Sequence, residues 1–364
     1  MQGEYEDERK TLATDEDGRI LLKRFSYTEL SDGDEIVDGD TLDDALVPVG
    51  GGGVSAGIDP DDIVGRCYAE MSKSFNIAQF YGFCYVHKGI VMGVGSTPNY
   101  CYIGRKYGLV WEQVLLPYID TYNFSVIHLD SGVCLIGTYG TGHILRSINS
   151  GLTWTDLGRI SAANLVYGFG YLAWDIVVAG LNSAPFLARS VDKGATWTTY
   201  TPAGINNPVF VITSLGDGKG LCGGNFTARV MLTDDAGATW YPCDTSPPLA
   251  AVSWFCSMDN GRLLCGYEQA VQIYYSDDGG QNWALLAGTP AVNHTVCCLY
   301  IRNGIVLLGT ESLGSLYIST DYAVTWSLVG RMYAELSIRQ LVYSEDDIIF
   351  LTTTAGGRVM RSVV

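Results

Sequence analysis

Four carboxylates in predicted surface loops are the side chains of this chain best suited to hydrolytic chemistry. They are Asp120, Glu268, Glu311 and Glu335. Two carboxyl groups about 5–10 Å apart can act as acid and base, or as acid and nucleophile, in glycoside hydrolysis. The sequence pairs no two of these residues, and exposed carboxylates are ordinarily only solvated. A glycoside hydrolase acting on surface polysaccharide therefore stays an alternative, and we assign no catalytic residue.

The same loops are rich in tyrosine and asparagine, which suits recognition. Aromatic faces and amide groups bind sugar rings and hydroxyls, and they bind protein surfaces equally well. The opposing interpretation is that the 23 tyrosines of the chain must lie somewhere and that surface loops are polar in any case. The ligand-binding candidates are Asp120, Tyr122, Asn123, Tyr139, Asn182, Asn206, Asn225, Tyr267, Glu311 and Tyr333.

Histidine and cysteine do not form a recognisable reactive centre. The four histidines occur without a nucleophile-elbow motif, so a Ser-His-Asp triad has no support. The ten cysteines have no CxxC pair and no zinc-type spacing with the histidines. We expect buried free thiols that behave as small hydrophobes, which favours folding in a reducing cytoplasm. We therefore predict no cofactor and no metal.

A repeat of 43 residues must position all of these loops. Six of the eight tryptophans stand at 111, 154, 197, 240, 283 and 326, each 43 residues after the last. In one period, residues 165–170, 174–179, 186–190 and 196–200 are each expected to form a short strand. No stretch shows sustained helical periodicity. A period in the 40s made of short strands is typical of a β-propeller with one blade per repeat.

Each period carries a short motif that ends in the tryptophan. The clearest copies are 190–197 (SVDKGATW), 233–240 (TDDAGATW) and 276–283 (SDDGGQNW). In two weaker copies Asn149 replaces the aspartate and Ala323 replaces the glycine. Aspartate can accept backbone N–H bonds in a turn, glycine permits a left-handed backbone, and tryptophan suits packing between blades. The residues given this structural role are Asp192, Gly194, Trp197, Asp235, Gly237, Trp240, Asp278, Gly280, Trp283, Asp321, Trp326 and Trp154.

The motif Ser/Thr-x-Asp-x-Gly-x-Thr/Asn-Trp resembles the Asp-box, or BNR repeat, over about residues 66–364. Asp-box propellers include sialidases, xyloglucan-degrading glycosidases, sortilin-type receptors and a photosystem assembly factor. The resemblance implies that the boxes are scaffold and lie away from a functional face.

A sialidase-like site would need three arginines to clamp a carboxylate. Arg339 is the only arginine in the expected inner strands. Arg146, Arg189 and Arg361 share a position on third strands, which we expect to look outward. We therefore expect a sialidase-like scaffold without the sialidase catalytic residues.

We predict an all-β fold, a seven-bladed β-propeller of four-stranded antiparallel blades. One period before Trp111, residues 66–71 resemble an outer strand, and the last repeat runs only to its third strand. An N-terminal strand at 66–71 can therefore complete the last blade. Such closure removes the exposed edge that an open array would leave.

The N-terminal part of the chain lies outside the repeat. Residues 1–65 carry 18 acidic and 5 basic side chains, a balance of −13, whereas the remainder is nearly neutral at −4. We divide the chain into an acidic N-terminal attachment arm (1–49), a Gly-rich hinge (50–65) and the propeller (66–364). We see no basic stripe for nucleic acid, no run long enough for membrane insertion and no signal peptide at the acidic start.

This layout resembles a virion appendage protein of a tailed bacteriophage, in which an N-terminal module docks to the particle and a β-rich domain faces outward. We expect a non-enzymatic virion protein, made in the host cytoplasm, as a tail or capsid-associated fibre component. Its expected partners are other virion proteins through the arm and a host-surface glycan or protein through the propeller; a homo-oligomer is compatible with this. An assembly-factor-like scaffold is a second alternative, but it predicts a targeting segment and gives the arm no role.

Overall fold

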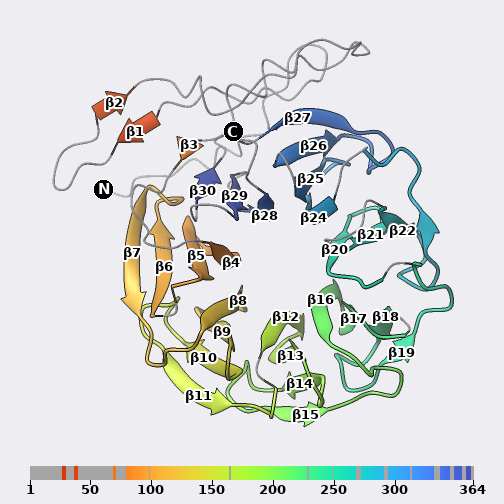
Figure 1. Cartoon of the computed structure of the whole chain (residues 1–364), viewed down its shortest axis with the longest axis horizontal. Coiled ribbons are helices and arrows are strands. Elements are labelled where there is room, and N and C mark those ends of the chain that lie inside the picture. The colour runs from red at the N-terminus through yellow and green to blue at the C-terminus, as the bar shows by residue number, and fades with distance from the viewer. Residues whose placement is uncertain are drawn as a thin grey trace, which may run out of the picture.

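The repeats of the sequence form antiparallel sheets arranged in a ring (Figure 1). In this computed structural model the described residues are 27–29, 37–39, 69–70, 79–97, 99–163, 165–227, 229–248, 250–267, 272–290, 294–311, 314–331, 337–344, 348–354 and 358–361. Within these ranges every element is a strand, and seven sheets have four strands each. That part of the chain has no helix long and apolar enough to cross a membrane. The predicted all-β, seven-bladed propeller is confirmed.

Each blade runs from an inner strand at the centre of the ring to an outer strand at its rim. The inner strands are β4 (Phe80–His87), β8 (Tyr122–His128), β12 (Val166–Ala173), β16 (Val209–Gly216), β20 (Trp254–Ser257), β24 (His294–Tyr300) and β28 (Ile338–Tyr343). The second strands are β5 (Ile90–Gly95), β9 (Cys134–Tyr139), β13 (Ile176–Leu181), β17 (Lys219–Gly224), β21 (Leu263–Gly266), β25 (Val306–Glu311) and β29 (Ile349–Thr353).

The third strands are β6 (Tyr100–Arg105), β10 (His143–Ser147), β14 (Leu187–Ser190), β18 (Val230–Thr233), β22 (Tyr274–Ser276), β26 (Ser315–Ser319) and β30 (Val359–Arg361). The outer strands are β7 (Val110–Leu115), β11 (Thr155–Arg159), β15 (Thr198–Tyr200), β19 (Tyr241–Pro242), β23 (Ala284–Leu285), β27 (Ser327–Arg331) and β3 (Ala69–Glu70). A separate antiparallel pair, β1 (Tyr27–Glu29) and β2 (Val37–Gly39), falls in the predicted arm. The rest of the predicted arm and the predicted hinge lie outside the described residues.

The last blade is completed by an N-terminal strand. Its strand order is β28-β29-β30-β3, with Ala69 opposite Arg361 and Glu70 opposite Met360. Arg361 also donates from its guanidinium to the carbonyl of Tyr107 in the first blade, over 3.2 Å. The predicted closure by a strand within 66–71 is confirmed, and this pairing covers the edge of β30.

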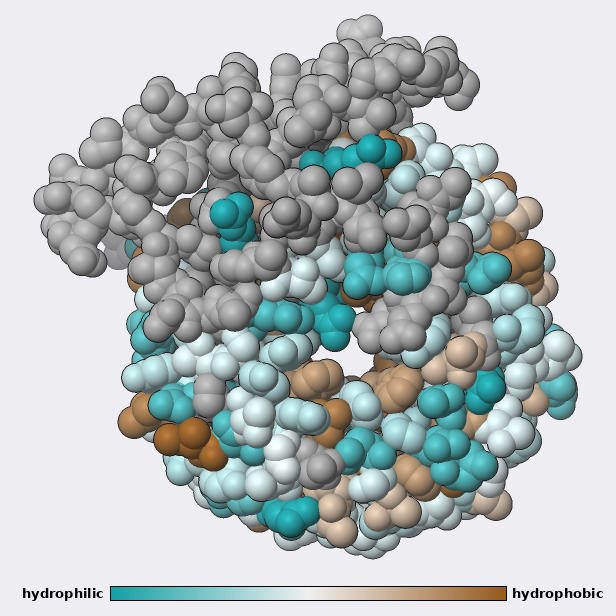
Figure 2. Space-filling view, viewed as in Figure 1, coloured by the Kyte–Doolittle hydropathy of each residue, from teal (hydrophilic) through white to brown (hydrophobic). Residues whose placement is uncertain are grey.

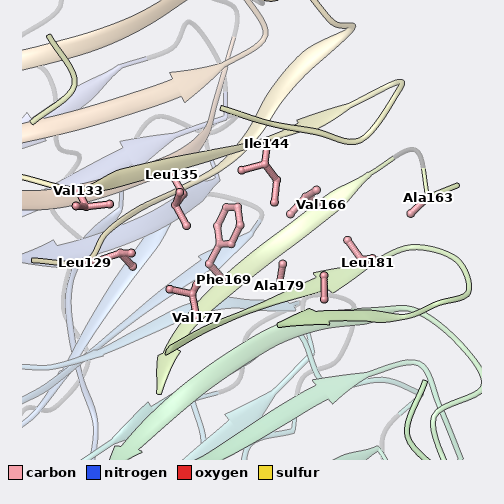
Figure 3. Packing of buried hydrophobic residues seen from close by; sticks show 11 residues of the cluster. Leu129, Val133, Leu135, Ile144, Ala163, Val166, Phe169, Val177, Ala179 and Leu181 are labelled. Carbon is pink, nitrogen blue, oxygen red and sulfur yellow. The ribbon is translucent and has the colours of Figure 1, made fainter. Parts of the chain in front are cut away.

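The hydrophobic core lies between neighbouring blades. Each of seven clusters of buried apolar side chains joins one blade to the next. Figure 3 shows the cluster between the second and third blades, where Leu135 and Ile144 lie near Phe169 and Val177. Box tryptophans such as Trp240, which is 7% exposed, belong to these clusters. The predicted packing of tryptophan between blades is confirmed, and burial of this apolar surface holds the ring together.

The Asp-box is a hydrogen-bonded turn between the third and outer strands. In the third blade the Ser190 hydroxyl donates to the Asp192 carboxylate over 2.7 Å and accepts from the Gly194 N–H over 2.8 Å. Asp192 also accepts from the Thr196 N–H over 2.8 Å and from the Thr196 hydroxyl over 2.6 Å. The carboxylate therefore bridges the two sides of the turn, as its predicted structural role requires.

Two successive left-handed residues shape this turn. Lys193 and Gly194 have φ angles of 53° and 77°, and Tyr322 and Ala323 in the sixth blade have 59° and 66°. A left-handed backbone costs an L-residue roughly 1–2 kcal/mol, which the hydrogen bonds of the box offset. A Cβ built on Gly194 would lie 2.7 Å from the Leu135 side chain of the preceding blade. Glycine at this position thus serves both the turn and the contact between blades.

Arginines on the third strands of three blades each donate a hydrogen bond to the backbone of the following blade, at its box turn or the equivalent turn. The Arg146 side chain donates to the carbonyl of Lys193, and Arg189 donates to the carbonyl of Ala236, each over 2.9 Å. Arg361 makes the equivalent bond to Tyr107 across the closing pair of blades. The expectation that these arginines look outward is wrong, because they reach sideways to a backbone carbonyl in the neighbouring blade.

Candidate functional site

A β-bulge recurs near the beginning of the inner strands. Pairing with the second strand shifts register between residues 80 and 82, 123 and 125, 166 and 168, 209 and 211, 295 and 297, and 338 and 340. The residues at these bulges are Tyr81, Phe124, Tyr167, Phe210, Val296 and Arg339. In the fifth blade β20 pairs without a shift, and Ser253 directly precedes it at the equivalent position. A bulge redirects the side chain that it carries.

These bulges lie toward the face opposite the Asp-boxes. The boxes of the second, third, fourth and sixth blades contact the turn that follows the inner strand of the same blade, as the Lys193 N–H does when it donates to the Asp175 carbonyl over 2.9 Å. The end of every such inner strand is therefore on the box face, and its beginning is on the other. The bulged side chains consequently belong to the face that the sequence predicts to be functional.

Four bulged residues form a continuous row of rings, which we call the aromatic collar: Tyr81, Phe124, Tyr167 and Phe210. Ring centroids lie 5.3 Å apart for Tyr81 and Phe124, 5.7 Å for Phe124 and Tyr167, and 4.7 Å for Tyr167 and Phe210. All four side chains are half-buried. Figure 2 shows an open channel at the centre of the ring, with hydrophobic residues on part of its rim. The inner strands of the first four blades therefore border this channel with aromatic surface.

Two predicted ligand-binding tyrosines extend the collar. Tyr122 lies 5.4 Å from Tyr81 and 5.7 Å from Tyr139 between ring centroids, and Tyr139 is 39% exposed. The hydroxyls of Tyr81, Tyr122 and Tyr139 form no hydrogen bond with any described residue. Aromatic surface and available hydroxyls therefore occur together at one end of the channel.

The remaining three blades contribute Ser253, Val296 and Arg339 at the same position. Burial raises the pKa of Tyr81 and the neighbouring Tyr122 raises it further, whereas the positive charge of Arg339 opposes this rise. Tyr122 and Arg339 therefore both act on Tyr81, although these three side chains come from three different blades. We call the collar, Tyr122, Tyr139 and Arg339 together the channel-mouth site.

Asp120 is held by hydrogen bonds from its own loop and from the end of β9 and the turn that follows it. Its Oδ2 accepts from the Thr138 hydroxyl at 2.6 Å, the Thr141 hydroxyl at 2.7 Å and the Thr141 N–H at 2.9 Å, and its Oδ1 accepts from the Thr121 N–H at 2.8 Å. Burial acts to raise the pKa of Asp120, but these hydrogen bonds hold it below its ordinary value. An ionised carboxylate with both oxygens occupied suits loop positioning, and it is unsuited to general acid catalysis.

The predicted asparagines separate into buried and exposed ones. Asn123 is 0% exposed, which removes it from the predicted recognition face. The Asn182 side chain accepts from the Leu165 N–H over 3.1 Å, so it fastens the loop between two strands. Asn206 and Asn225 are exposed, and both lie in loops of the fourth blade.

Three further candidates lie apart from the collar. Tyr267 is half-buried and packs against the core between the fourth and fifth blades. Glu311 pairs with His294 across the first two strands of the sixth blade, at 2.6 Å. Tyr333 lies outside the described residues.

Of the four carboxylates proposed for hydrolysis, the two that the structure describes, Asp120 and Glu311, are not brought together. Asp120 precedes β8 in the second blade and Glu311 ends β25 in the sixth, which are separated around the ring (Figure 1). Glu268 and Glu335 lie outside the described residues. The box aspartates belong to the opposite face. Burial acts to raise the pKa of Asp192, but hydrogen bonds from Thr196 and Ser190 hold it below its ordinary value.

Other reactive groups in the described chain are engaged or buried. His143 contacts Asp156 at 2.9 Å and stacks on Tyr118, without a serine nucleophile in this group. The nine described cysteines are free, as predicted, and burial raises the pKa of thiols such as Cys222. No group of three or more potential metal ligands occurs among the described side chains.

Comparison with known proteins agrees with this architecture. The BNR/Asp-box repeat model matches residues 274–285. No curated protein sequence matches the chain. A YCF48 structure bound to a D1 peptide is 16% identical over 82% of this chain and 96% of its own, with a TM-score of 0.65. A streptogramin B lyase structure is 14% identical over 81% of this chain and 96% of its own, with a TM-score of 0.68.

An enzyme that acts on a polysaccharide has a similar fold. The GH74 xyloglucanase from Xanthomonas campestris is 16% identical over 72% of this chain and 46% of its own, with a TM-score of 0.56. These proteins have different functions, so the likeness defines the architecture only. The chain is a seven-bladed β-propeller that carries the BNR/Asp-box repeat.

Sequence reasoning identified Tyr122 and Tyr139 but missed the collar that they extend. A usable signal was present, because Tyr81, Phe124, Tyr167 and Phe210 stand 43 residues apart, in phase with the repeat. The direction of their side chains depends on the bulge, which the alternation of residues along a strand does not predict.

Proposed function

We propose that this chain is a non-enzymatic recognition propeller that binds a host-surface glycan at the channel-mouth site. The observation that supports this most is the row of rings from Tyr139 through the collar, together with the available hydroxyls of Tyr81, Tyr122 and Tyr139. Aromatic faces pack against the apolar faces of sugar rings, and phenolic hydroxyls exchange hydrogen bonds with sugar hydroxyls. Binding without cleavage is favoured because Asp120 is ionised and engaged in its loop.

The glycan proposal is tested with the full chain on a glycan array, followed by titration of the bound saccharide and an assay for release of reducing ends. Tyr122→Ala and Tyr139→Ala are expected to weaken binding at least about tenfold, because each removes a stacking surface and a hydroxyl. Trp174→Ala is the matched control, since Trp174 is 73% exposed in the turn after β12, on the box face. It should leave affinity unchanged.

Other outcomes would contradict this function. Absence of binding to every glycan on the array would contradict glycan recognition. Release of reducing ends would favour the hydrolase alternative. A protein ligand competed away by the same tyrosine variants would favour protein recognition, and the YCF48 fold bound to a D1 peptide shows that a similar propeller can hold one.

We further propose that the propeller is displayed on the particle of a tailed bacteriophage and attached to other virion proteins through the acidic N-terminal arm. The support is the division of charge, −13 in residues 1–65 against −4 in the remainder. Mass spectrometry of purified particles is expected to find the chain in the particle, and a chain without residues 1–65 is expected to stay in the lysate. Incorporation of that shortened chain at the normal level would contradict attachment through the arm.

A further inference from the structure

We propose that Arg339 makes the channel-mouth site selective for acidic saccharides, by pairing its guanidinium with the carboxylate of a hexuronate residue. This inference rests on the proposed glycan recognition and names the class of glycan.

The first support is the position of Arg339 in the ring. It is the only charged residue among the seven equivalent positions of the inner strands, where the others are Tyr81, Phe124, Tyr167, Phe210, Ser253 and Val296. The bulge between Ile338 and Gln340 gives Arg339 the same place in its blade that the collar residues have in theirs. Its charge acts on Tyr81 of the adjacent first blade and on Cys297 of the sixth. Arg339 therefore lies at the same site as the rings.

The second support is the chemistry of this mixture. A planar guanidinium pairs with a carboxylate through two parallel N–H···O bonds. Aromatic rings bordering the same channel offer flat surfaces to the C–H face of a sugar. A hexuronate presents both features on one ring, with the carboxylate at its edge and hydroxyls that the free phenols of Tyr81 and Tyr122 can bind.

The third support is the charge balance. One guanidinium compensates one carboxylate, whereas a phosphomonoester carries about −1.5 to −2 charges at neutral pH and would stay partly uncompensated. Residues 66–364 carry a formal net charge of −4, so the overall field of the propeller does not attract an anion. Recognition of an acidic sugar must therefore come from a local partner, which Arg339 supplies.

The test compares oligouronates with their uncharged methyl esters. A panel of oligogalacturonate, oligoglucuronate and oligoguluronate, each with its ester, is titrated into the full chain. At least one acid should bind, and its ester should bind roughly tenfold to a hundredfold more weakly. Arg339→Gln should weaken binding of the acid to a similar extent while leaving the ester unchanged. Arg302→Gln removes the same charge from the turn after β24 on the box face, and it should have no effect.

Several results would overturn the inference. Equal affinities for the acid and its ester would contradict the inference, and so would an unchanged affinity of Arg339→Gln for the acid. Either result would leave glycan recognition in place. Binding of sulfated or phosphorylated glycans in place of uronates would also do so. If Arg339→Gln fails to fold, the acid and ester comparison on the unaltered chain and the variant Arg339→Lys still decide. Loss of all saccharide binding on the array would instead reject the proposed function.

Discussion

Removal of residues 1–71 is expected to open the ring, whereas removal of residues 1–65 is expected to leave the propeller as stable as the full chain. The shorter cut retains Ala69 and Glu70, which pair with Arg361 and Met360 of the last blade. The longer cut deletes β3 and leaves the edge of β30 unpaired. Loss of two or more backbone hydrogen bonds costs about 2–4 kcal/mol, and an open edge promotes association between chains.

This comparison is measured by urea unfolding for stability and by light scattering for association. The chain that begins at residue 66 is the matched control, because both shortened chains lack the acidic segment. Equal unfolding midpoints for the two shortened chains would show that β3 does not close the ring energetically. Loss of stability in both would instead place the boundary of the propeller before residue 66.

Asp192→Ala is expected to lower the free energy of unfolding by about 2–3 kcal/mol, because the Thr196 N–H and two hydroxyls lose their partner. Asp192→Asn should lower it by less than about 1 kcal/mol. The second blade already contains this replacement, since the Asn149 carbonyl accepts from the Thr153 N–H over 2.9 Å and its amide donates to the Thr153 hydroxyl over 2.8 Å. The threonine hydroxyl reverses its role from donor to acceptor.

The pH dependence gives a second measurement for the same variants. Because the folded pKa of Asp192 lies below its ordinary value of about 3.9, the carboxylate stabilises the fold above that pH. This contribution is lost as the pH falls through the folded pKa, so the deficit of Asp192→Ala should shrink below about pH 4. Equal costs for the alanine and asparagine variants at pH 7, or a deficit that persists in acid, would contradict the assigned hydrogen bonds.

The architecture could be predicted because the repeat has a constant period of 43 residues and a recognisable motif in most copies. Trp154, Trp240 and Trp283 stand in phase, and the hydrogen bonds of the box are local, joining residues two to four apart. Strand bounds were less certain where the chain turns. Trp174 was expected to begin a strand at 174–179, but it lies in the turn before β13 (Ile176–Leu181).

The candidate site could be predicted only in part, because the burial of its side chains and their hydrogen-bond partners depend on neighbouring strands and blades. Tyr122 and Tyr139 were predicted as ligand-binding loop aromatics, and the structure places their rings beside the collar. Asn123 directly follows Tyr122 in sequence and is completely buried. Asp120 was a candidate member of a hydrolytic carboxylate pair, but Thr138 and Thr141 donate hydrogen bonds to it and hold its pKa below the ordinary value.

The sequence by itself determined the all-β class, the seven blades, the closing strand and the structural role of the boxes. These features depend on periodicity and on contacts within one hairpin, which a repeated string of residues expresses directly. Tertiary structure alone decided which side chains border the channel, where Arg339 lies relative to Tyr81, and that Arg146 and Arg189 join blades. Bulges and contacts between blades set those positions, and both arise only when seven sheets pack into one ring.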